Sequence, residues 1–458
     1  MIDNPWGALE DASAEPTQVE WLHHTLARNA NTAYLKQFGS PDTLQAFRSR
    51  VPPCSYEDLS SYLARLQAGE NDVLFSGRPV AYERTGGSAG GPKLIPYSRE
   101  GLQDFQRGIV PWLARTTKNY NITGQAYFSI SPATREPEFV GATPIGLSDA
   151  AYLGERAGPV LARQTAVPLS VGSVQDTSWW RQQTVTHLKA ARDLELISVW
   201  SPTFLLRLLE DIPDAQLCWP RLKVISCWAS GSAHRYADQL KQLLPHAAIQ
   251  PKGLLSTEAI VTIPDDGDKP VLAAHGFTEF AHGNDLRLED ELDQGSEYEV
   301  VVTTASGLYR YRTGDRVRFE GRNDSGKAIL EFVGRDSLSS DLVGEKLTET
   351  FVGKCLGNIP GFAMLVPDVV RPGYSVVCEQ TPSNAQLTAL ENSLCANPQY
   401  AYARKLGQLA PLRVLKCMRP FSVIERVMLE RGTRLGDIKP VALRTEAFWL
   451  PLFDESMS

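Results

Sequence analysis

The residues best suited to chemistry lie in one glycine-rich stretch, Thr85-Gly86-Gly87-Ser88-Ala89-Gly90-Gly91-Pro92-Lys93. Glycines let a backbone turn tightly and bring its N–H groups close to an anion. The hydroxyls of Thr85 and Ser88 add hydrogen-bond donors, and Lys93 adds a mobile positive charge. This composition predicts a phosphate-binding loop, and a flexible surface turn is the alternative.

Two known nucleotide-binding patterns do not match this loop. In a Walker sequence, GxxxxGK[ST], the lysine directly follows a glycine, whereas Pro92 separates Gly91 from Lys93. The GxGxxG pattern in a strand-turn-helix setting does not match either, which disfavours a dinucleotide-binding fold. The rest of the chain has to show which ligand the loop serves.

A second candidate is the acidic residue of Ser256-Thr257-Glu258. Glu258 stands in an apolar run, and a carboxylate buried there must be paired, protonated or bound to a metal. Mg²⁺ fits, because it takes one or two carboxylates together with the phosphate oxygens of a nucleotide. A plain salt bridge satisfies the same carboxylate and is the alternative.

A third candidate is Asp315, which follows the run Tyr309-Arg310-Tyr311-Arg312. Alternation in this run predicts a strand with the tyrosines on one face and the arginines on the other, and Thr313-Gly314-Asp315 is predicted to be a turn. A carboxylate accepts the two hydroxyls of a ribose well. Asp315 is therefore a candidate ribose ligand or only a turn-forming residue.

Helical and strand-like segments must position these residues. Residues 18–72 have the apolar spacing of helices, with Ser55 as an N-cap. Residues 101–117 predict a helix interrupted near Pro111, followed by a strand over 126–131 and a loop over 131–154. Two helices, over 178–195 and 201–212, then flank the apolar strand LISVW. Three tryptophans of this region are either walls of a ligand pocket or core residues: Trp179, Trp180 and Trp200.

The strand VISCW then runs into a small-residue turn that contains Gly231 and Ser232. A turn between a strand and a helix faces the ligand in open α/β sheets. From about residue 270 the pattern changes to strands, and beyond a polar boundary it becomes a smaller α+β unit. The expected fold is therefore α/β, with a large domain over 1–336 that includes a β-rich part and a smaller, mobile α+β domain over 337–458.

Composition excludes several classes of protein. The 458 residues include 43% hydrophobic and 22% charged residues, which is typical of a soluble globular chain. The net charge of −7 and the lack of a long basic run disfavour binding to nucleic acid. The acidic start and the absence of a long apolar segment predict a cytoplasmic protein without a membrane partner. The 7 cysteines form no CxxC pair, so structural zinc and a disulfide framework are not expected.

Taken together, the motifs resemble a known group of enzymes. TGGSAGGPK, STE, YRTGD and the pair Gly334-Arg335, in that order and at wide separations, resemble the acyl- and aryl-adenylate-forming superfamily of ligases. More closely, the chain resembles the Gretchen Hagen family of acyl-acid amido synthetases in its compact bacterial form. The segments that carry this closer likeness are RNANTAYLKQFG, VPPCSYEDL, KLIPYS, YEVVVTTASGLYRYRTGD, NPQYAYARKLGQL and RLGDIKP.

The resemblance implies a reaction in two steps that uses ATP and Mg²⁺. A carboxylate attacks the α-phosphate to form acyl-AMP and pyrophosphate, and an amine, usually an amino acid, then displaces AMP to form an amide. The first transition state gathers negative charge, which loop N–H groups, lysines and a magnesium held by Glu258 can stabilise. The aromatic content of residues 125–205 suggests an aryl or moderately apolar acid.

The resemblance also implies roles for individual residues. Lys93, Glu258 and Lys439 are expected to be catalytic, Lys439 as the lysine of the C-terminal domain that enters the site for adenylation. Ser88 and Thr257 are expected at phosphate, and Asp315 at ribose. The expected nucleotide-binding set is Thr85, Gly87, Ser88, Gly231, Ser232, Ser256, Thr257, Tyr311, Asp315 and Arg335, with Gly231, Ser232 and Tyr311 against adenine.

Two other hypotheses remain open from the sequence. The first is that the chain is an acyl- or aryl-CoA ligase or an adenylating enzyme that loads a carrier protein. The second is that it is a nucleotide-binding protein without turnover. The hinge region lacks the paired acidic-lysine pattern of acyl-CoA ligases, which favours amide formation. The joint presence of Lys93, Glu258, Asp315 and Arg335 argues against a scaffold without chemistry.

Overall fold

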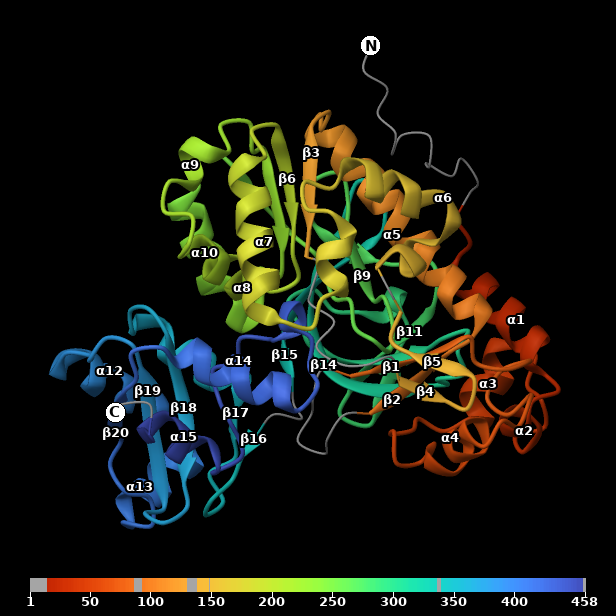
Figure 1. Cartoon of the computed structure of the whole chain (residues 1–458). Coiled ribbons are helices and arrows are strands. Elements are labelled where there is room, and N and C mark those ends of the chain that lie inside the picture. The colour runs from red at the N-terminus through yellow and green to blue at the C-terminus, as the bar shows by residue number, and fades with distance from the viewer. Residues whose placement is uncertain (1–14, 86–92, 130–137, 148, 336–338, 456–458) are drawn as a thin grey trace.

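The structure is a computed structural model that describes residues 15–85, 93–129, 138–147, 149–335 and 339–455 (Figure 1). Helices and strands are mixed along the chain, and the strands form one parallel sheet, one large antiparallel sheet and three smaller sheets. The predicted α/β class is confirmed.

Short helices open the described chain, as the sequence predicts: α1 (Gln18–Asn29), α2 (Ala33–Lys36), α3 (Leu44–Arg50) and α4 (Ser60–Gln67). The expected N-cap at Ser55 is wrong. Ser55 and Asp58 instead exchange backbone and side-chain hydrogen bonds of 2.8 to 3.3 Å, which close a turn before the helix. Because that turn consumes the capping groups, α4 begins only at Ser60.

A four-stranded parallel sheet forms the upper part of the molecule in Figure 1, in the order β3-β6-β7-β8. Its strands are β3 (Gln125–Phe128), β6 (Leu194–Ser198), β7 (Val224–Cys227) and β8 (Ala248–Pro251). Between them run α7 (Thr177–Ala190), α8 (Pro202–Leu209), α9 (Ala215–Cys218) and α10 (His234–Leu243). The predicted alternation of strand and helix is therefore confirmed, as expected for parallel strands that need crossover connections.

Helix α5 (Arg99–Asn119) runs through Pro111 without a break, so the predicted interruption is wrong. Proline within a helix removes one hydrogen bond and costs about 3 kcal/mol. Against this cost, Ile109, Trp112 and Leu113 are buried on the same helix, and each buried side chain of this size contributes about 1.5–3 kcal/mol. Packing thus outweighs the local preference.

The predicted loop over 131–154 is also wrong where it is described. It contains β4 (Glu138–Val140), β5 (Thr143–Ile145) and the start of α6 (Asp149–Gln164). Strand β5 pairs in parallel with β1 (Ala81–Arg84), which itself pairs with β2 (Leu94–Tyr97). Since its partner lies more than fifty residues away in the sequence, the local pattern held no signal for this strand.

A seven-stranded antiparallel sheet carries the β-rich part, in the order β12-β11-β13-β14-β15-β10-β9. Asp315 lies inside its long strand β14 (Tyr311–Arg322) and not in a turn. The pairing with β13 (Glu297–Thr303) shifts register between Glu299 and Val301, opposite Gly314, whose φ is +74°. The predicted turn is thus a β-bulge within a continuous strand. The remaining strands are β9 (Thr262–Pro264), β10 (Pro270–Leu272), β11 (Phe277–His282), β12 (Asp285–Arg287) and β15 (Ala328–Arg335).

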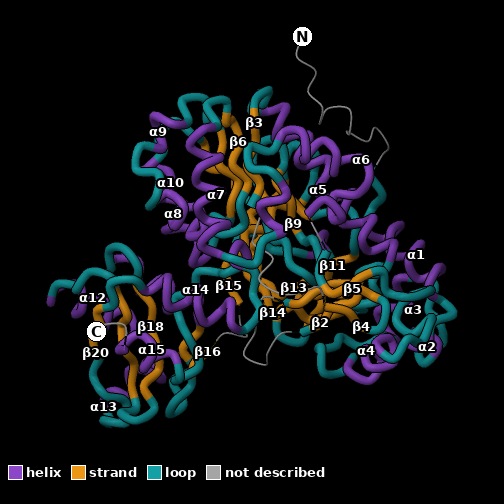
Figure 2. Tube along the Cα trace, in the orientation of Figure 1, coloured by secondary structure: helices purple, strands orange, loops and turns teal. Residues whose placement is uncertain are grey.

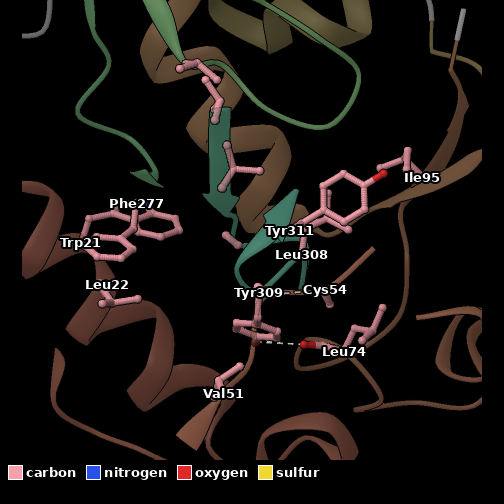
Figure 3. Close-up of a cluster of buried hydrophobic side chains, with 14 of the residues drawn as sticks. Trp21, Leu22, Val51, Cys54, Leu74, Ile95, Phe277, Leu308, Tyr309 and Tyr311 are labelled. Carbon is pink, nitrogen blue, oxygen red and sulfur yellow. Dashed lines mark hydrogen bonds between the residues drawn. The ribbon is translucent and has the colours of Figure 1, made fainter. Parts of the chain in front are cut away.

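A large hydrophobic core joins the N-terminal helices to this antiparallel sheet (Figure 3). Tyr309 is fully buried in it, stacks on Tyr34 at 5.2 Å between ring centroids, and donates its hydroxyl to the Leu74 carbonyl at 2.9 Å. This core holds the segment just before β14 in place. The start of β14, whose residues face the site, is therefore held in place by this core.

The C-terminal elements, called the C-terminal unit below, lie at the lower left of Figure 1, and Figure 2 shows their strands side by side. Its main sheet has the order β18-β19-β20, as the predicted strands and helix require. The elements are β16 (Ser339–Ser340), β17 (Leu347–Thr348), α11 (Glu349–Cys355), β18 (Ala363–Asp368), β19 (Gly373–Cys378), α12 (Asn384–Leu394), α13 (Pro398–Lys405), β20 (Arg413–Lys416), α14 (Pro420–Glu430) and α15 (Trp449–Glu455). Within the described ranges, no helix is long and apolar enough to cross a membrane.

Candidate active site

The hairpin of β1 and β2 positions the glycine-rich loop. The backbone N–H of Thr85 donates to the Lys93 carbonyl at 2.9 Å, and the Lys93 N–H donates to Thr85 Oγ1 at 3.1 Å. These bonds fix both ends of the loop at the end of the hairpin. Gly87 and Ser88 lie outside the described residues, so their predicted phosphate contacts stay predictions.

Lys93 points toward strand β14. Its Nζ lies 3.4 Å from the Tyr311 hydroxyl and 5.2 Å from the centroid of the Tyr56 ring. Tyr311 is almost fully buried, and burial together with the nearby Glu258 charge raises the pKa of its phenol. Tyr311 therefore stays protonated and holds the lysine next to the antiparallel sheet.

Asp315 and Arg335 face each other across β14 and β15. Arg335 Nε donates to Asp315 Oδ1 at 2.6 Å, while Oδ2 has only a marginal contact at 3.5 Å. Burial lowers the pKa of Arg335, the Asp315 carboxylate raises it, and the net change is upward. The pair gives a buried carboxylate a charged hydrogen-bond donor and leaves one of its oxygens with capacity for a further hydroxyl donor.

The segment Ser256-Thr257-Glu258 follows β8 and is held as a tight turn. The Ser256 N–H donates to the Ala259 carbonyl at 3.0 Å, and the Ala259 N–H donates to Ser256 Oγ at 3.2 Å. Tyr97 adds a hydrogen bond of 2.7 Å from its hydroxyl to the Thr257 carbonyl. The turn therefore fixes the backbone on either side of Glu258.

Glu258 is partly exposed, and within the described ranges its carboxylate has neither a hydrogen bond nor a salt bridge. The alternative that a salt bridge satisfies Glu258 is therefore not supported by any described residue. Burial is the main cause of the raised pKa of Tyr97 and Tyr311, and the Glu258 charge adds to it. The same charge opposes the lowering of the Lys439 pKa, so these groups lie in the neighbourhood of one carboxylate. The structure thereby brings together residues that the sequence singled out separately.

A small cavity of about 40 Å³ adjoins Glu258. Tyr97, Asp104, Thr257 and His275 also line it. This volume holds about one or two water molecules. Among the residues that the structure describes, no three His, Cys, Asp or Glu side chains converge as a metal site, so a cation at Glu258 would need oxygens from a ligand.

Lys439 reaches the same place from the C-terminal unit. It keeps contact with solvent, and its Nζ lies 5.3 Å from the centroid of the Trp228 ring. The surrounding protein and the Arg335 charge lower the pKa of its amine, whereas Asp315, Glu258 and Asp437 raise it. The predicted lysine thus lies among the groups with which it was expected to act.

Gly231 and Ser232 begin a short 3₁₀ turn (Gly231–Ala233) after β7. Gly231 has φ of +58°, and a Cβ there would lie 3.3 Å from the Phe332 ring. Ser232 donates its hydroxyl to Glu349 of α11, and the same Glu349 oxygen accepts the Ala442 N–H at 3.0 Å. Ser232, predicted at the adenine, therefore also joins the two parts of the chain.

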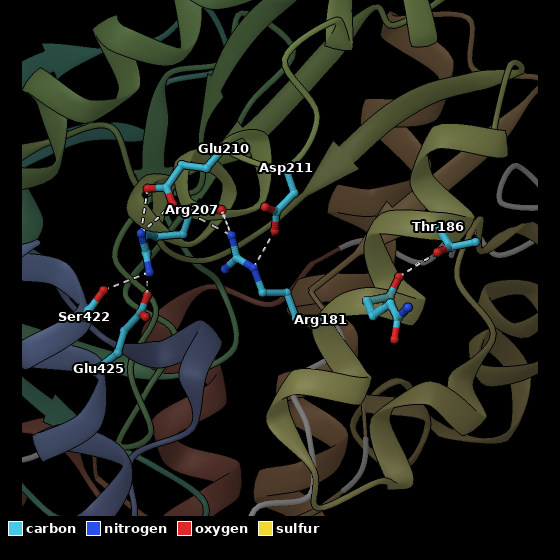
Figure 4. A network of polar contacts seen from close by, with 8 residues as sticks. Arg181, Thr186, Arg207, Glu210, Asp211, Ser422 and Glu425 are labelled. Atoms are coloured by element: carbon cyan, nitrogen blue, oxygen red, sulfur yellow. Dashed lines mark hydrogen bonds and ion pairs between the residues drawn. The ribbon is translucent and has the colours of Figure 1, made fainter.

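A polar network adds a second bridge to the C-terminal unit (Figure 4). Arg207 of α8 donates to the Ser422 hydroxyl at 3.0 Å and to the Glu425 carboxylate at 3.4 Å, both on α14. The Ser232 contact, the bond from Arg235 to the Ile359 carbonyl at 2.7 Å and the contact between the Tyr236 and Phe421 rings also join this unit to the rest of the chain.

The sequence missed one cationic residue, Lys252, which follows β8. Lys252 is almost fully buried, its Nζ lies 4.8 Å from the ring of Trp112 and 4.7 Å from that of Trp200, and it donates to Ser198 Oγ at 2.7 Å. A lysine six positions before Glu258 in an otherwise apolar run was the available signal.

The three tryptophans that the sequence left open have different roles. Trp180 is fully buried and packs on Phe204 at 5.8 Å, so it is a core residue. Trp179 lies at the surface and is 41% exposed. Trp200 is only partly buried and contacts Lys252, which leaves it as the one of the three that fits a pocket wall.

Comparison with known proteins gives family matches over much of the chain. The model of the GH3 family N-terminal domain matches residues 9–214, and that of the GH3 family central domain matches residues 270–335. A probable indole-3-acetic acid-amido synthetase, GH3.1 of Oryza sativa subsp. japonica, is 25% identical over 74% of this chain and 69% of its own length. The indole-3-acetic acid-amido synthetase GH3.15 of Arabidopsis thaliana is 26% identical over 76% of this chain and 73% of its own length.

Solved structures share the fold. The AtGH3.15 acyl acid amido synthetase in complex with 2,4-DB has a TM-score of 0.83 at 20% identity, and the match covers 96% of this chain and 93% of that one. A 2-hydroxyisobutyryl-CoA ligase in the postadenylation state has a TM-score of 0.55 at 12% identity and matches 99% and 98% of the two chains.

Proposed function

This chain belongs to the GH3 (Gretchen Hagen) family within the adenylate-forming superfamily, and from that premise we propose that it is an ATP-dependent acyl-acid amido synthetase. The observation that carries the proposal is the convergence of Lys93, Asp315 with Arg335, and Glu258, from distant segments of the chain, with Lys439 from the C-terminal unit. Such a set of fixed charges suits a reaction in which charge moves from a carboxylate to phosphate oxygens.

In the first step, an oxygen of the acid's carboxylate bonds to the α-phosphorus of ATP, and the bond from that phosphorus to the bridging oxygen of pyrophosphate breaks. Lys93 contacts Tyr311, and the charge of Glu258 acts on both Tyr311 and Lys439. The two lysines can therefore offset the negative charge that develops on the α-phosphate. The free lone pairs of Asp315 accept the ribose hydroxyls, and Arg335 holds that carboxylate in place.

A magnesium ion fits the residues that are present. Glu258 offers a partly exposed carboxylate with no protein partner in the described ranges, and a single carboxylate together with phosphate oxygens is a usual magnesium environment. When bound, the ion would supply Lewis-acid stabilisation of phosphate charge. The tight turn at Ser256 sets the direction of this carboxylate.

In the second step, the nitrogen of an amine bonds to the acyl carbon, and the bond from that carbon to the bridging oxygen of the adenylate breaks. AMP leaves with the oxygen, and the amine proton passes to solvent. The amine is an amino acid in this proposal, in keeping with the amido synthetase names of the relatives. The site contains no side chain that must form a covalent bond to the acyl group.

The acid is proposed to be an aryl or moderately apolar carboxylic acid. Trp200 and Trp228 are both partly exposed, their rings lie 6.1 Å apart, and Lys439 lies against Trp228. An acid whose carboxylate reaches the lysine would place its apolar part along these rings. The relatives named for indole-3-acetic acid and the complex with 2,4-DB concern acids of this kind.

The proposed organisation is two domains that meet near residues 336 and 337. β15 of the antiparallel sheet ends at Arg335, and the strands after Ser339 belong to other sheets. Movement at this boundary would let Lys439 leave after adenylation so that the amine can approach. The cytoplasmic location expected from the sequence stays a prediction.

Mass spectrometry of one reaction tests the function. The mixture holds the protein, ATP, Mg²⁺, a panel of aryl and aliphatic acids, the amino acids and coenzyme A. An amide formed together with AMP is the expected result and names both substrates. A thioester would move the chain to the CoA ligases, and the absence of AMP with every acid would favour a nucleotide-binding protein without turnover.

A further inference from the structure

Lys252 is a buried amine that the proposed reaction does not use. It is 4% exposed, and it extends the face of strand β8 that helix α5 covers, since Gln250, two residues earlier, contacts Thr116 of α5 at 3.2 Å. Two indole faces and one hydroxyl are its near neighbours. Such a site is built around the amine, because removing a lysine from water is costly without compensation.

No acidic side chain of the described residues forms a salt bridge with Lys252. Burial lowers the pKa of the amine to about 7, and the neighbouring Cys227 opposes part of this shift. Interactions with the indole faces of Trp112 and Trp200 offset part of the cost of burying an ammonium. Of the amine's N–H donors, only the one directed at Ser198 has an oxygen acceptor within the described ranges.

Two other polar groups in this layer also lack partners. The indole N–H of Trp112 is buried and has no acceptor among the described residues, although the same ring contacts Lys252. The hydroxyl of Ser226 is buried without a partner as well, and Ser226 is paired in register with Ser198 on the neighbouring strand. Buried polar groups in folded proteins usually have a hydrogen-bond partner, and leaving one without a partner is destabilising.

Lys252 is connected to the reacting centre by aromatic rings. Trp200 contacts Lys252, its ring lies 6.1 Å from that of Trp228, and Trp228 contacts Lys439. Both rings between the two lysines are partly exposed. Phe105, Phe128 and Ile260, which are also partly exposed, pack on the cluster that contains Trp112. An acid bound along these rings has its carboxylate near Lys439 and its far end near Lys252.

We propose that Lys252 determines substrate specificity by donating a hydrogen bond to an oxygen at the end of the acid opposite the reacting carboxylate. The substrate class is therefore an aryl or moderately apolar acid that carries a distal hydroxyl, carbonyl or second carboxylate. This inference rests on the proposed function, because it takes Lys439 to mark the carboxylate end. The ligand oxygen supplies the acceptor that the amine lacks, and an acid without it leaves the amine unsatisfied.

The test compares three acids that differ only at the distal position: 3-phenylpropionate, 3-(4-hydroxyphenyl)propionate and 3-(4-carboxyphenyl)propionate. We expect the wild-type protein to prefer an oxygenated acid by at least about tenfold in kcat/KM for AMP formation. Lys252→Met should remove that preference and change kcat/KM for phenylpropionate by less than about threefold, since methionine keeps the length and apolar stem. If Lys252→Met loses activity only with the carboxyphenyl acid, Lys252 recognises an anionic distal group. If it loses activity with both oxygenated acids, Lys252 acts as a hydrogen-bond donor to either oxygen.

Binding supplies a readout that does not depend on turnover. Trp112 and Trp200 contact Lys252, so their fluorescence should change when an acid fills this place. Titration of each acid into wild-type and Lys252→Met protein gives the preference directly. If the wild type binds an oxygenated acid more tightly than Lys252→Met does but forms no AMP, the proposed function fails, whereas the hydrogen bond from Lys252 to the distal oxygen is retained.

Two further variants separate specificity from stability. Ser198→Ala removes the one acceptor that orients the amine and should reduce the preference by about threefold to tenfold with the fold intact. Lys189→Met, an exposed lysine of α7, should change nothing. Equal losses for all three acids in Lys252→Met, or a wild type that binds none of them or does not distinguish them, would overturn the inference.

Discussion

Trp200 and Trp228 form a short row of indole rings with one lysine at each end, Lys252 beside Trp200 and Lys439 beside Trp228. The two lysines differ in how their charge is compensated. At the Lys439 end the lysine shares its surroundings with Asp315, Glu258 and Arg335, and acidic and basic groups alternate over a short distance. At the Lys252 end a single amine is enclosed by indoles, and its one hydrogen bond in the described ranges goes to a hydroxyl. The first arrangement suits a charged ligand that reacts, and the second suits recognition of one oxygen.

The comparison shows how one residue type takes two roles in one protein. The pKa of both amines is lowered, at Lys252 by burial and at Lys439 by the surrounding protein and the Arg335 charge. Nearby carboxylates counteract the change at Lys439, and within the described ranges none does so at Lys252. The neighbouring carboxylates therefore favour the cationic form of Lys439, as charge stabilisation requires. Lys252 has a pKa near neutrality and is a donor whose charge depends on its ligand.

The largest expected effect is at the reacting end. Lys439→Ala should lower the rate of pyrophosphate release by at least about a hundredfold, because it removes a charge aimed at the developing anion. A coupled pyrophosphate assay with saturating ATP and acid measures it. Lys416→Ala, an exposed lysine of β20 in the same unit, is the control and should retain full activity. An active Lys439→Ala protein would contradict the role of this end.

Substitutions of Glu258 and Lys93 should have the next-largest effects on pyrophosphate release. Glu258→Ala and Lys93→Ala are each expected to lower pyrophosphate release by at least about tenfold, by analogy with the loss of one charge-stabilising group. For Glu258→Gln the concentration of Mg²⁺ at half-maximal rate should also rise, since the amide is a poorer magnesium ligand. Rates and magnesium titrations equal to those of a folded wild type would remove magnesium binding from the role of Glu258.

Asp315 should affect both binding and stability. Asp315→Asn weakens the ribose contact and leaves the partly buried Arg335 without its counter-ion. We expect KM for ATP to rise about tenfold and the free energy of unfolding to fall by about 1–3 kcal/mol, less than for a fully dry pair because Arg335 keeps some contact with water. Steady-state kinetics and urea unfolding measure the two changes. An unaltered KM would exclude Asp315 as the ribose ligand.

The contribution of Lys252 to the free energy of unfolding should change with pH in the opposite direction from that of a lysine paired with a carboxylate. Between pH 7 and about 10.5 the unfolded chain holds a proton on Lys252 that the folded chain has lost, so wild-type stability rises with pH across this window. Lys252→Met lacks this contribution. The stability advantage of the variant, measured by urea unfolding, should be greatest below pH 7 and shrink as the pH rises. A difference independent of pH would contradict the buried-amine account.

The smallest effect concerns the contact between the two parts of the chain. Arg207→Ala removes the bonds to Ser422 and Glu425, which are partly exposed and worth at most about 1 kcal/mol. We expect pyrophosphate release to fall by less than about threefold, because the Ser232 contact with Glu349 remains. A large loss would show that the other contacts between the two parts do not suffice to position Lys439.

Local sequence patterns predicted much of this fold. The strand LISVW between two helices and the strands of the C-terminal unit were readable because period and composition report local structure. The patterns failed where distant contacts decided: Pro111 stays within α5 because that helix is packed, and β5 exists because β1 pairs with it. Thr313-Gly314-Asp315 looked like a turn, but the neighbouring strands carry it as a bulge.

The sequence by itself determined the family, the chemistry of the candidate residues and their order along the chain, since these depend on residue types and motif spacing. Only the tertiary structure decided which of them meet. Lys93 and Tyr311 are 218 positions apart and come within 3.4 Å because the hairpin packs beside the antiparallel sheet. Lys252 carried no motif, and its isolation from any acidic partner in the described ranges appears only after α5 has covered the sheet, because burial and distance are properties of packing.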